Sequence, residues 1–266
     1  MVESTDKSIG TEDLYKKYER VLTELFGHAK SVSKKKFLSS LSPETETIID
    51  GELVRHRIDI PDMEIQETIH THSVLESYIR NEKEDRKTRI KLMLLVSFHI
   101  LEADRWHSIL GNLLKVIAEN NYELDLLVDD ALKTKRNKIE RLLKKCKSKG
   151  LNLSIEQAYD EIINDNILFL RNAFFHSQYH IPPNGSVILI TKGAVRELLK
   201  TLDRIRQCKT LKPMTDQSKK QRRKTQYRFD EVQEIYRRVI TFITVFALKR
   251  NQILRDLSPT GKRSVC

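Results

Sequence analysis

SIEQAYDEIINDNILFLRNAFFHSQY, residues 154–179, combines a helical apolar pattern with a cluster of polar side chains at its far end. Ser154 followed three residues later by Gln157 matches a capping box, in which two side chains satisfy the free N–H groups of a helix start. Apolar residues then recur at helical spacing, which predicts a single helix. They are Ala158, Ile162, Ile163, Ile167, Leu168 and Leu170. Because proline cannot continue a helix, Pro182–Pro183 places its end near residues 176–179.

The chain after this helix predicts a β-hairpin. In YHIPPNGSVILI, residues 179–190, two β-prone runs flank PPNG, and Asn184–Gly185 suits the positive φ of a tight turn. A further amphipathic helix is expected over residues 191–207. Residues 211–228 are then a basic connector, which is either a solvated linker or a contact to RNA phosphates.

The flanking segments also have helical patterns. Residues 91–120 predict a long buried helix or a helix pair, in which the lone Trp106 is a core residue and His107 its hydrogen-bonded neighbour. Residues 125–150 predict an amphipathic helix that ends at Gly150. A last helix, over 229–257, packs either centrally or against a second copy of the chain.

The N-terminal third gives weaker signals. Residues 11–30 predict a helix with Thr11 as its N-cap and Gly27 as its end. Residues 31–89 mix turn signals, short alternating runs and a charge block. His70 and His72 are candidates for one face of a strand, and without nearby Cys or carboxylate ligands we expect a surface role for them rather than a metal site. The expected fold is therefore all-α, with four parts in chain order. These are an accessory region at 1–89, a helical domain at 90–210, the basic linker at 211–228 and the C-terminal helix at 229–257.

Composition limits the classes of function. The formal net charge of +11 and the pI of about 9.5 indicate either an anionic partner, with nucleic acid the leading candidate, or a basic solvated surface. Cys146, Cys208 and Cys266 form no ligand or disulfide pattern and suit a reducing cytosol. The longest apolar runs are about half of the ~20 residues that a membrane span needs, so we expect no membrane segment. The N-terminus has no apolar run, so we expect no signal peptide there.

Arg171, Asn172 and His176 bring three useful groups into one short segment. A guanidinium binds phosphate through paired N–H donors, an amide orients or hydrogen-bonds, and an imidazole moves protons near neutral pH. The structural alternative is that Arg and His simply complement the dipole at a helix C-terminus. A metal site at His176 and His180, four residues apart, lacks a third ligand, so we expect no metal.

LRNAFFHSQY, residues 170–179, resembles the motif of the HEPN (higher eukaryotes and prokaryotes nucleotide-binding) superfamily. That motif is an Arg, a polar residue directly after it and a His several residues on, and Arg171, Asn172 and His176 match these positions. The resemblance covers roughly residues 90–210. It implies a HEPN-like helical bundle in which a short β-hairpin follows the motif helix.

The resemblance also implies a function. Family members are often metal-independent ribonucleases of toxin–antitoxin, phage-defence and RNA-processing systems, while others are catalytically silent binding or assembly modules. It implies RNA as the substrate, no cofactor, and a homodimer whose composite site takes His176 from both chains, with an antitoxin or regulatory protein as a further partner. Some family toxins carry a Tyr two residues after the His, which partner nucleotidyltransferases modify. Here the Tyr is Tyr179, one residue later, which puts such an antitoxin in doubt.

Three hypotheses result from the sequence. The first is a homodimeric cytoplasmic endoribonuclease that uses Arg171, Asn172 and His176, with Tyr179 either stacking on a base or packing against the hairpin. The second is a non-catalytic module of the same fold that binds RNA or a protein. The third is a helical regulatory protein whose basic linker binds nucleic acid.

Overall fold

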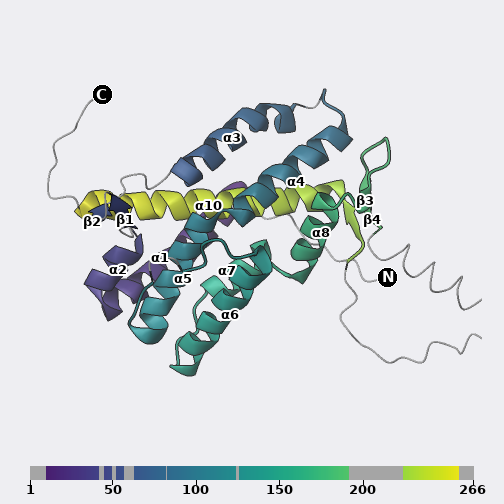
Figure 1. Ribbon diagram of the computed structural model, residues 1–266. Helices are drawn as coiled ribbons and strands as arrows, with labels where there is room; N and C mark the ends of the chain where they lie inside the picture. The colour runs from purple at the N-terminus through teal and green to yellow at the C-terminus, as the bar shows by residue number, and fades with distance from the viewer. Residues whose placement is uncertain are drawn as a thin grey trace, which may run out of the picture.

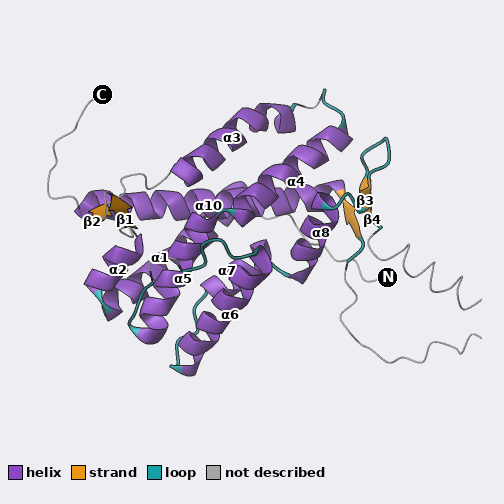
Figure 2. Ribbon diagram, in the orientation of Figure 1, coloured by secondary structure: helices purple, strands orange, loops and turns teal. Residues whose placement is uncertain are grey.

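The structure, a computed structural model, describes residues 10–41, 45–49, 52–56, 63–81, 83–123, 126–191 and 224–257. It is mostly helical, which confirms the all-α class (Figure 2). The helices are α1 Thr11–Val32, α2 Lys34–Leu41, α3 Met63–Arg80, α4 Arg86–Glu102, α5 Asp104–Glu119, α6 Leu132–Ser148, α7 Ile155–Ile162, α8 Asp165–Phe175 and α10 Phe229–Leu257. The helix expected over 191–207 and most of the basic linker lie outside the described residues.

The long helix α10 lies at the centre of the bundle, between α1 and α4 (Figure 1). Phe242 of α10 packs against aromatic side chains of two neighbouring helices. Its ring lies 5.3 Å from that of Tyr18 on α1 and 5.8 Å from that of Trp106 on α5. Trp106 is buried, as expected. Of the two positions predicted for the C-terminal helix, the structure therefore shows the central one. The helix α1 belongs to the same core, while a domain boundary at residue 89 stays a prediction.

The stretch 91–120 forms a helix pair, α4 and α5, that bends at Ala103. Side chains beyond the bend return to the end of α4: the indole N–H of Trp106 donates to the carbonyl of Ile100 at 2.8 Å, and Nε2 of His107 lies 2.9 Å from the carbonyl oxygen of Leu101. Burial lowers the pKa of His107 to about 3, so the imidazole is neutral. These buried contacts fix the end of α4, on which part of the candidate site depends.

The predicted hairpin is confirmed. Strand β3 (Tyr179–His180) pairs antiparallel with β4 (Val187–Ile190), and β4 pairs with a third strand, β5 (Gln226–Arg228). Gly185 has a φ of +60°, and a Cβ there would overlap the first residues of α4. The prediction of a basic connector over residues 211–228 is therefore wrong at its C-terminal end, because residues 226–228 form the third strand of this sheet. A separate pair, β1 (Thr45–Ile49) with β2 (Glu52–His56), is also antiparallel.

The single helix predicted over 154–176 is two helices, α7 and α8. The capping box is not formed: the side chain of Ser154 caps nothing, and Gln157 donates to Glu161 at 3.3 Å. The chain instead extends at Ile163, and the side chain of Asn164 accepts hydrogen bonds from the N–H groups of residues 166 and 167. A strong N-cap therefore interrupts an apolar pattern that fits one continuous helix.

Four further expectations were wrong. Helix α1 runs past Gly27 to Val32, because Phe26 and Ala29 are buried on either side of the glycine, and its N-cap is Gly10 rather than Thr11. Helix α6 begins at Leu132, seven residues later than predicted. The two histidines expected on a strand lie on helix α3, where Nε2 of His72 is 2.6 Å from the hydroxyl of Tyr236 on α10.

Candidate functional site

The motif residues lie at the C-terminal end of α8, where this helix packs against α4 (Figure 1). Arg171 and Asn172 are within α8, and His176 is its C-cap, with its N–H donating to the carbonyl of Asn172 at 3.1 Å. The helix thus ends where the prolines predicted. Ser177 then adopts a φ of +53°, which turns the chain directly into β3.

The guanidinium of Arg171 is held on three sides. Its Nε donates to Oε1 of Glu102 on α4 at 2.5 Å, and its Nη2 pairs with the same carboxylate. Its Nη1 donates to Oδ1 of Asn172 at 2.9 Å. Its Cζ also lies 4.8 Å from the centre of the Phe175 ring. The cation is therefore oriented before any ligand arrives, and the Asn172 side chain bonds Arg171 rather than His176.

The His176 side chain is exposed. It makes no hydrogen bond or ion pair with the described part of the chain. An exposed imidazole at the end of a helix can exchange protons with a bound molecule. The structure therefore brings an oriented guanidinium and an available imidazole to the same end of α8.

An aromatic cluster underlies the site. The buried ring of Phe98 on α4 lies 5.7 Å from Phe174 and 6.0 Å from Phe175. Tyr179 stacks on Phe174 at 5.4 Å with 21° between the ring planes, and burial raises the pKa of its hydroxyl. Tyr179 therefore belongs to the hairpin and packs on α8, whereas the expected packing role was against the hairpin.

Glu102 is the site residue that sequence reasoning missed. It lies 69 positions before Arg171, and no short motif links the two residues. Its side chain is 34% exposed and that of Arg171 is 26% exposed, so the ion pair is accessible to solvent but not fully solvated. The only sign of Glu102 in the sequence was its place as an acidic residue at the end of an apolar helix. Such residues are too common to identify one of them as the partner of Arg171.

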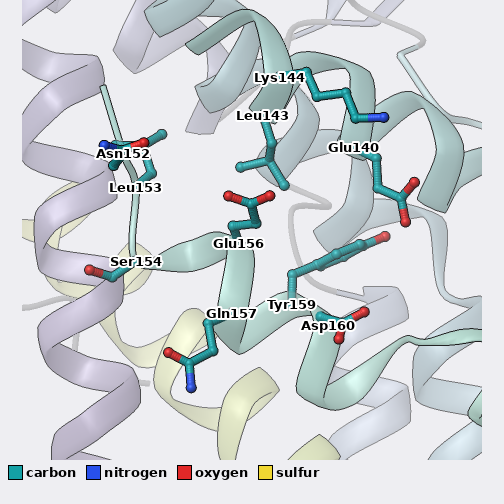
Figure 3. A pocket seen from close by; sticks show the side chains of 10 residues that line it. All are labelled: Glu140, Leu143, Lys144, Asn152, Leu153, Ser154, Glu156, Gln157, Tyr159 and Asp160. Atoms are coloured by element: carbon teal, nitrogen blue, oxygen red, sulfur yellow. The ribbon is translucent and has the colours of Figure 1, made fainter. Parts of the chain in front are cut away.

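A pocket of about 550 Å³ lies away from the motif, between α6, α7 and the segment that joins them (Figure 3). Glu140, Glu156 and Asp160 line it together with one lysine, Lys144. Burial raises the pKa of Asp160, and Arg136 binds Glu140 at 2.7 Å beside the pocket. Carboxylates repel phosphate, so this pocket does not suit a nucleic-acid backbone.

Within the described ranges, no group of three or more His, Cys, Asp or Glu residues is arranged to hold a metal ion. His180, the other histidine of the considered metal pair, follows His176 across the turn and is exposed on β3. None of the described helices is both long enough and apolar enough to cross a lipid bilayer.

No protein-family model, no curated protein and no solved structure matches this chain. A functional proposal therefore rests on the arrangement of Glu102, Arg171 and His176 and on the motif in the sequence.

Proposed function

We propose that this protein is a metal-independent endoribonuclease of HEPN type that acts in the cytoplasm as a toxin or phage-defence effector. The observation that carries the proposal is the pairing of a pre-oriented guanidinium, Arg171, with an exposed imidazole, His176, which has no hydrogen-bond partner among the described residues, at one end of α8. The net charge of +11 favours an RNA substrate, because cations raise the local concentration of a polyanion.

The chemistry uses a nucleophile that RNA itself carries, the ribose 2′-hydroxyl. The enzyme removes the proton of this hydroxyl, stabilises the charge of the phosphorane and protonates the leaving 5′-oxygen. Arg171 stabilises the phosphorane and His176 transfers a proton. The products are a 2′,3′-cyclic phosphate and a 5′-hydroxyl, and no cofactor takes part.

One imidazole cannot serve as acid and base in the same step. The family resemblance assigns the second proton transfer to His176 of a second copy of the chain, in a composite site at a dimer interface. Phe175, next to His176, is 46% exposed, which is compatible with an apolar contact at such an interface. The homodimer is part of the proposal.

The alternative function is a non-catalytic module that binds RNA or a protein. One observation favours it: Nε, Nη1 and Nη2 of Arg171 already have partners inside the chain. A phosphate must then displace Glu102 or share the remaining N–H donors. In this alternative, Arg171 and Glu102 hold α8 against α4.

Cleavage assays separate the two functions. Total tRNA and mRNA are incubated in EDTA with the wild type, with His176→Ala and with His180→Ala, a matched control that removes an exposed imidazole four residues away. The proposal predicts cleavage by the wild type and the control, and a loss of at least about 100-fold in His176→Ala. Equal cleavage by His176→Ala would place the activity elsewhere, and RNA binding without cleavage by the wild type would favour the binding module.

A further inference from the structure

The pocket between α6 and α7 has no role in the proposed cleavage. Its volume is about 550 Å³, and Leu143, Leu153 and Tyr159 are its buried lining residues (Figure 3). The remaining lining residues are polar or charged. Sites for small organic ligands have volumes of about 300–1,000 Å³ and combine apolar surface with a few polar groups in the same way. The pocket is therefore suited to a small organic ligand, and its charge decides which kind.

Arg136 lies beside the pocket and faces more carboxylates than it neutralises. Its Nε is 2.7 Å from Oε1 of Glu140, and its Nη1 is 2.7 Å from Oδ1 of Asp165 on α8. Its Nη2 also lies 3.9 Å from Oδ1 of Asp160. One guanidinium is thus shared by three carboxylates, two of which line the pocket.

Glu156 adds a further negative charge. Its side chain is exposed and lines the pocket, and its carboxylate has neither an ion pair nor a hydrogen bond within the described part of the chain. Among the described lining residues, only Lys144 is basic. Together with Arg136 and its three partners, these side chains are four carboxylates and two cations, a formal charge of −2 in a chain whose net charge is +11. Such an excess of carboxylates attracts a cationic ligand.

The hydroxyl of Tyr159 is an independent sign of a ligand. Tyr159 is 2% exposed, and its hydroxyl has no hydrogen-bond partner among the described residues. The ring is held in the core, 6.3 Å from the rings of both Trp106 and His107. Figure 3 shows the hydroxyl end directed towards the carboxylates of Glu140 and Asp160, which line the pocket with it. A buried hydroxyl is costly without a partner, and this one can accept a hydrogen bond from an ammonium group.

The arrangement of the carboxylates selects the kind of cation. In the ranges that the structure describes, no three Asp, Glu, His or Cys side chains converge in a way that could hold a metal ion. The carboxylates of the pocket can instead bind separate positive charges of one extended ligand. A polyamine has ammonium groups joined by methylene chains, so it offers both the separated charges and an apolar surface for the buried lining residues.

We propose that this pocket is a binding site for an aliphatic polyamine. Glu156 binds one ammonium group, and Asp160 binds another, from which the hydroxyl of Tyr159 accepts a hydrogen bond. The methylene chain between the two groups packs on Leu143 and Leu153. The inference is independent of the proposed ribonuclease function, since none of these residues belongs to the motif.

Isothermal titration calorimetry on the full chain, with spermidine as the probe at a fixed ionic strength, tests the site. The wild type should bind spermidine saturably, and Glu156→Gln and Tyr159→Phe should each bind it about tenfold more weakly. The matched control is Glu12→Gln, which changes an exposed glutamate of α1 outside the pocket and should bind as the wild type does. Tyr159→Phe should also keep the urea midpoint of the free protein, because the lost hydroxyl has no partner among the described residues.

Two further probes separate the kinds of cation. Butylamine, which has a single ammonium group, should bind about tenfold more weakly than spermidine, and Mg²⁺ should not displace spermidine. Equal affinities for butylamine and spermidine would assign the pocket to a single ammonium group, such as a lysine side chain, and displacement by Mg²⁺ would show unselective attraction of cations. No saturable binding by the wild type, or equal binding by the wild type and both pocket variants, would overturn the inference. None of these results depends on whether the protein cleaves RNA.

Discussion

Replacing Glu102 with Gln changes the contact that orients the guanidinium of Arg171. The substitution keeps one acceptor oxygen at nearly the same place and removes the negative charge. The side chains of the pair are 34% and 26% exposed, between a surface pair and a buried one. Exposed pairs contribute about 0–1 kcal/mol and hydrogen bonds to charged groups about 1.5–3 kcal/mol, so we expect a coupling of about 1 kcal/mol.

A double-mutant cycle measures this coupling. The free energies of unfolding in urea are compared for the wild type, Glu102→Gln, Arg171→Met and the double variant. The matched control is the cycle on Glu12 and Lys16, an ion pair of α1 whose side chains are 81% and 66% exposed, where the coupling should stay below about 0.5 kcal/mol.

The coupling also affects the proposed contact of Arg171 with RNA. On a His176→Ala background, which under the proposed function does not cleave RNA, Glu102→Gln should tighten RNA binding, because a phosphate no longer competes with a carboxylate for the guanidinium. A coupling no larger than that of the control cycle, together with unchanged RNA affinity, would show that Glu102 does not hold Arg171 in solution. The guanidinium of Arg171 would then not be oriented before a ligand binds.

Further predictions concern the elements that support the site. Asn164→Ala removes the N-cap of α8 and should lower the free energy of unfolding by about 1 kcal/mol, whereas Ser154→Ala, which caps nothing, should leave the urea midpoint unchanged. Gly185→Ala should destabilise the protein, since a Cβ at a φ of +60° would overlap the start of α4, and an unchanged melting temperature would contradict the turn described here. His107 is buried and its pKa is lowered to about 3. Between about pH 6.5 and 3, the unfolded chain therefore binds a proton at this imidazole and the folded chain does not. Stability should therefore fall as the pH drops from about 6.5 towards 3, by at most about 1.4 kcal/mol per pH unit from this group. His107→Asn should flatten that slope in urea titrations, and an equal slope in the variant and the wild type would assign the pH dependence to other groups.

Local signals in the sequence predicted the end of the motif helix and the hairpin. Pro182–Pro183 forbids a longer helix, and Asn184–Gly185 supplies the turn, so both features depend on residues next to one another. The break between α7 and α8 was missed, because Ile162 and Ile163 are both buried and fit a continuous helix equally well. Asn164 carried the signal, yet a polar residue in an apolar pattern also occurs at solvated positions inside a helix.

Long-range contacts explain the remaining differences. Helix α1 was read as part of an accessory region, yet Tyr18 packs on Phe242, 224 residues away along the chain. The bond from Arg171 to Glu102 likewise joins two helices that no local pattern relates. Apolar periodicity shows that a helix has a buried face but not which helix covers it. The sequence therefore contained the motif but gave no sign of its orienting carboxylate, Glu102.

The ends of the RNA products test the central claim most directly. Purified protein is incubated with RNA in EDTA, and the fragments are examined for 2′,3′-cyclic phosphates and for 5′-hydroxyls that a polynucleotide kinase labels without prior phosphatase treatment. The account predicts both end groups with the wild type and neither with His176→Ala. Fragments that carry 3′-hydroxyls and 5′-phosphates would show attack by water instead of the 2′-hydroxyl, and would contradict the proposed chemistry.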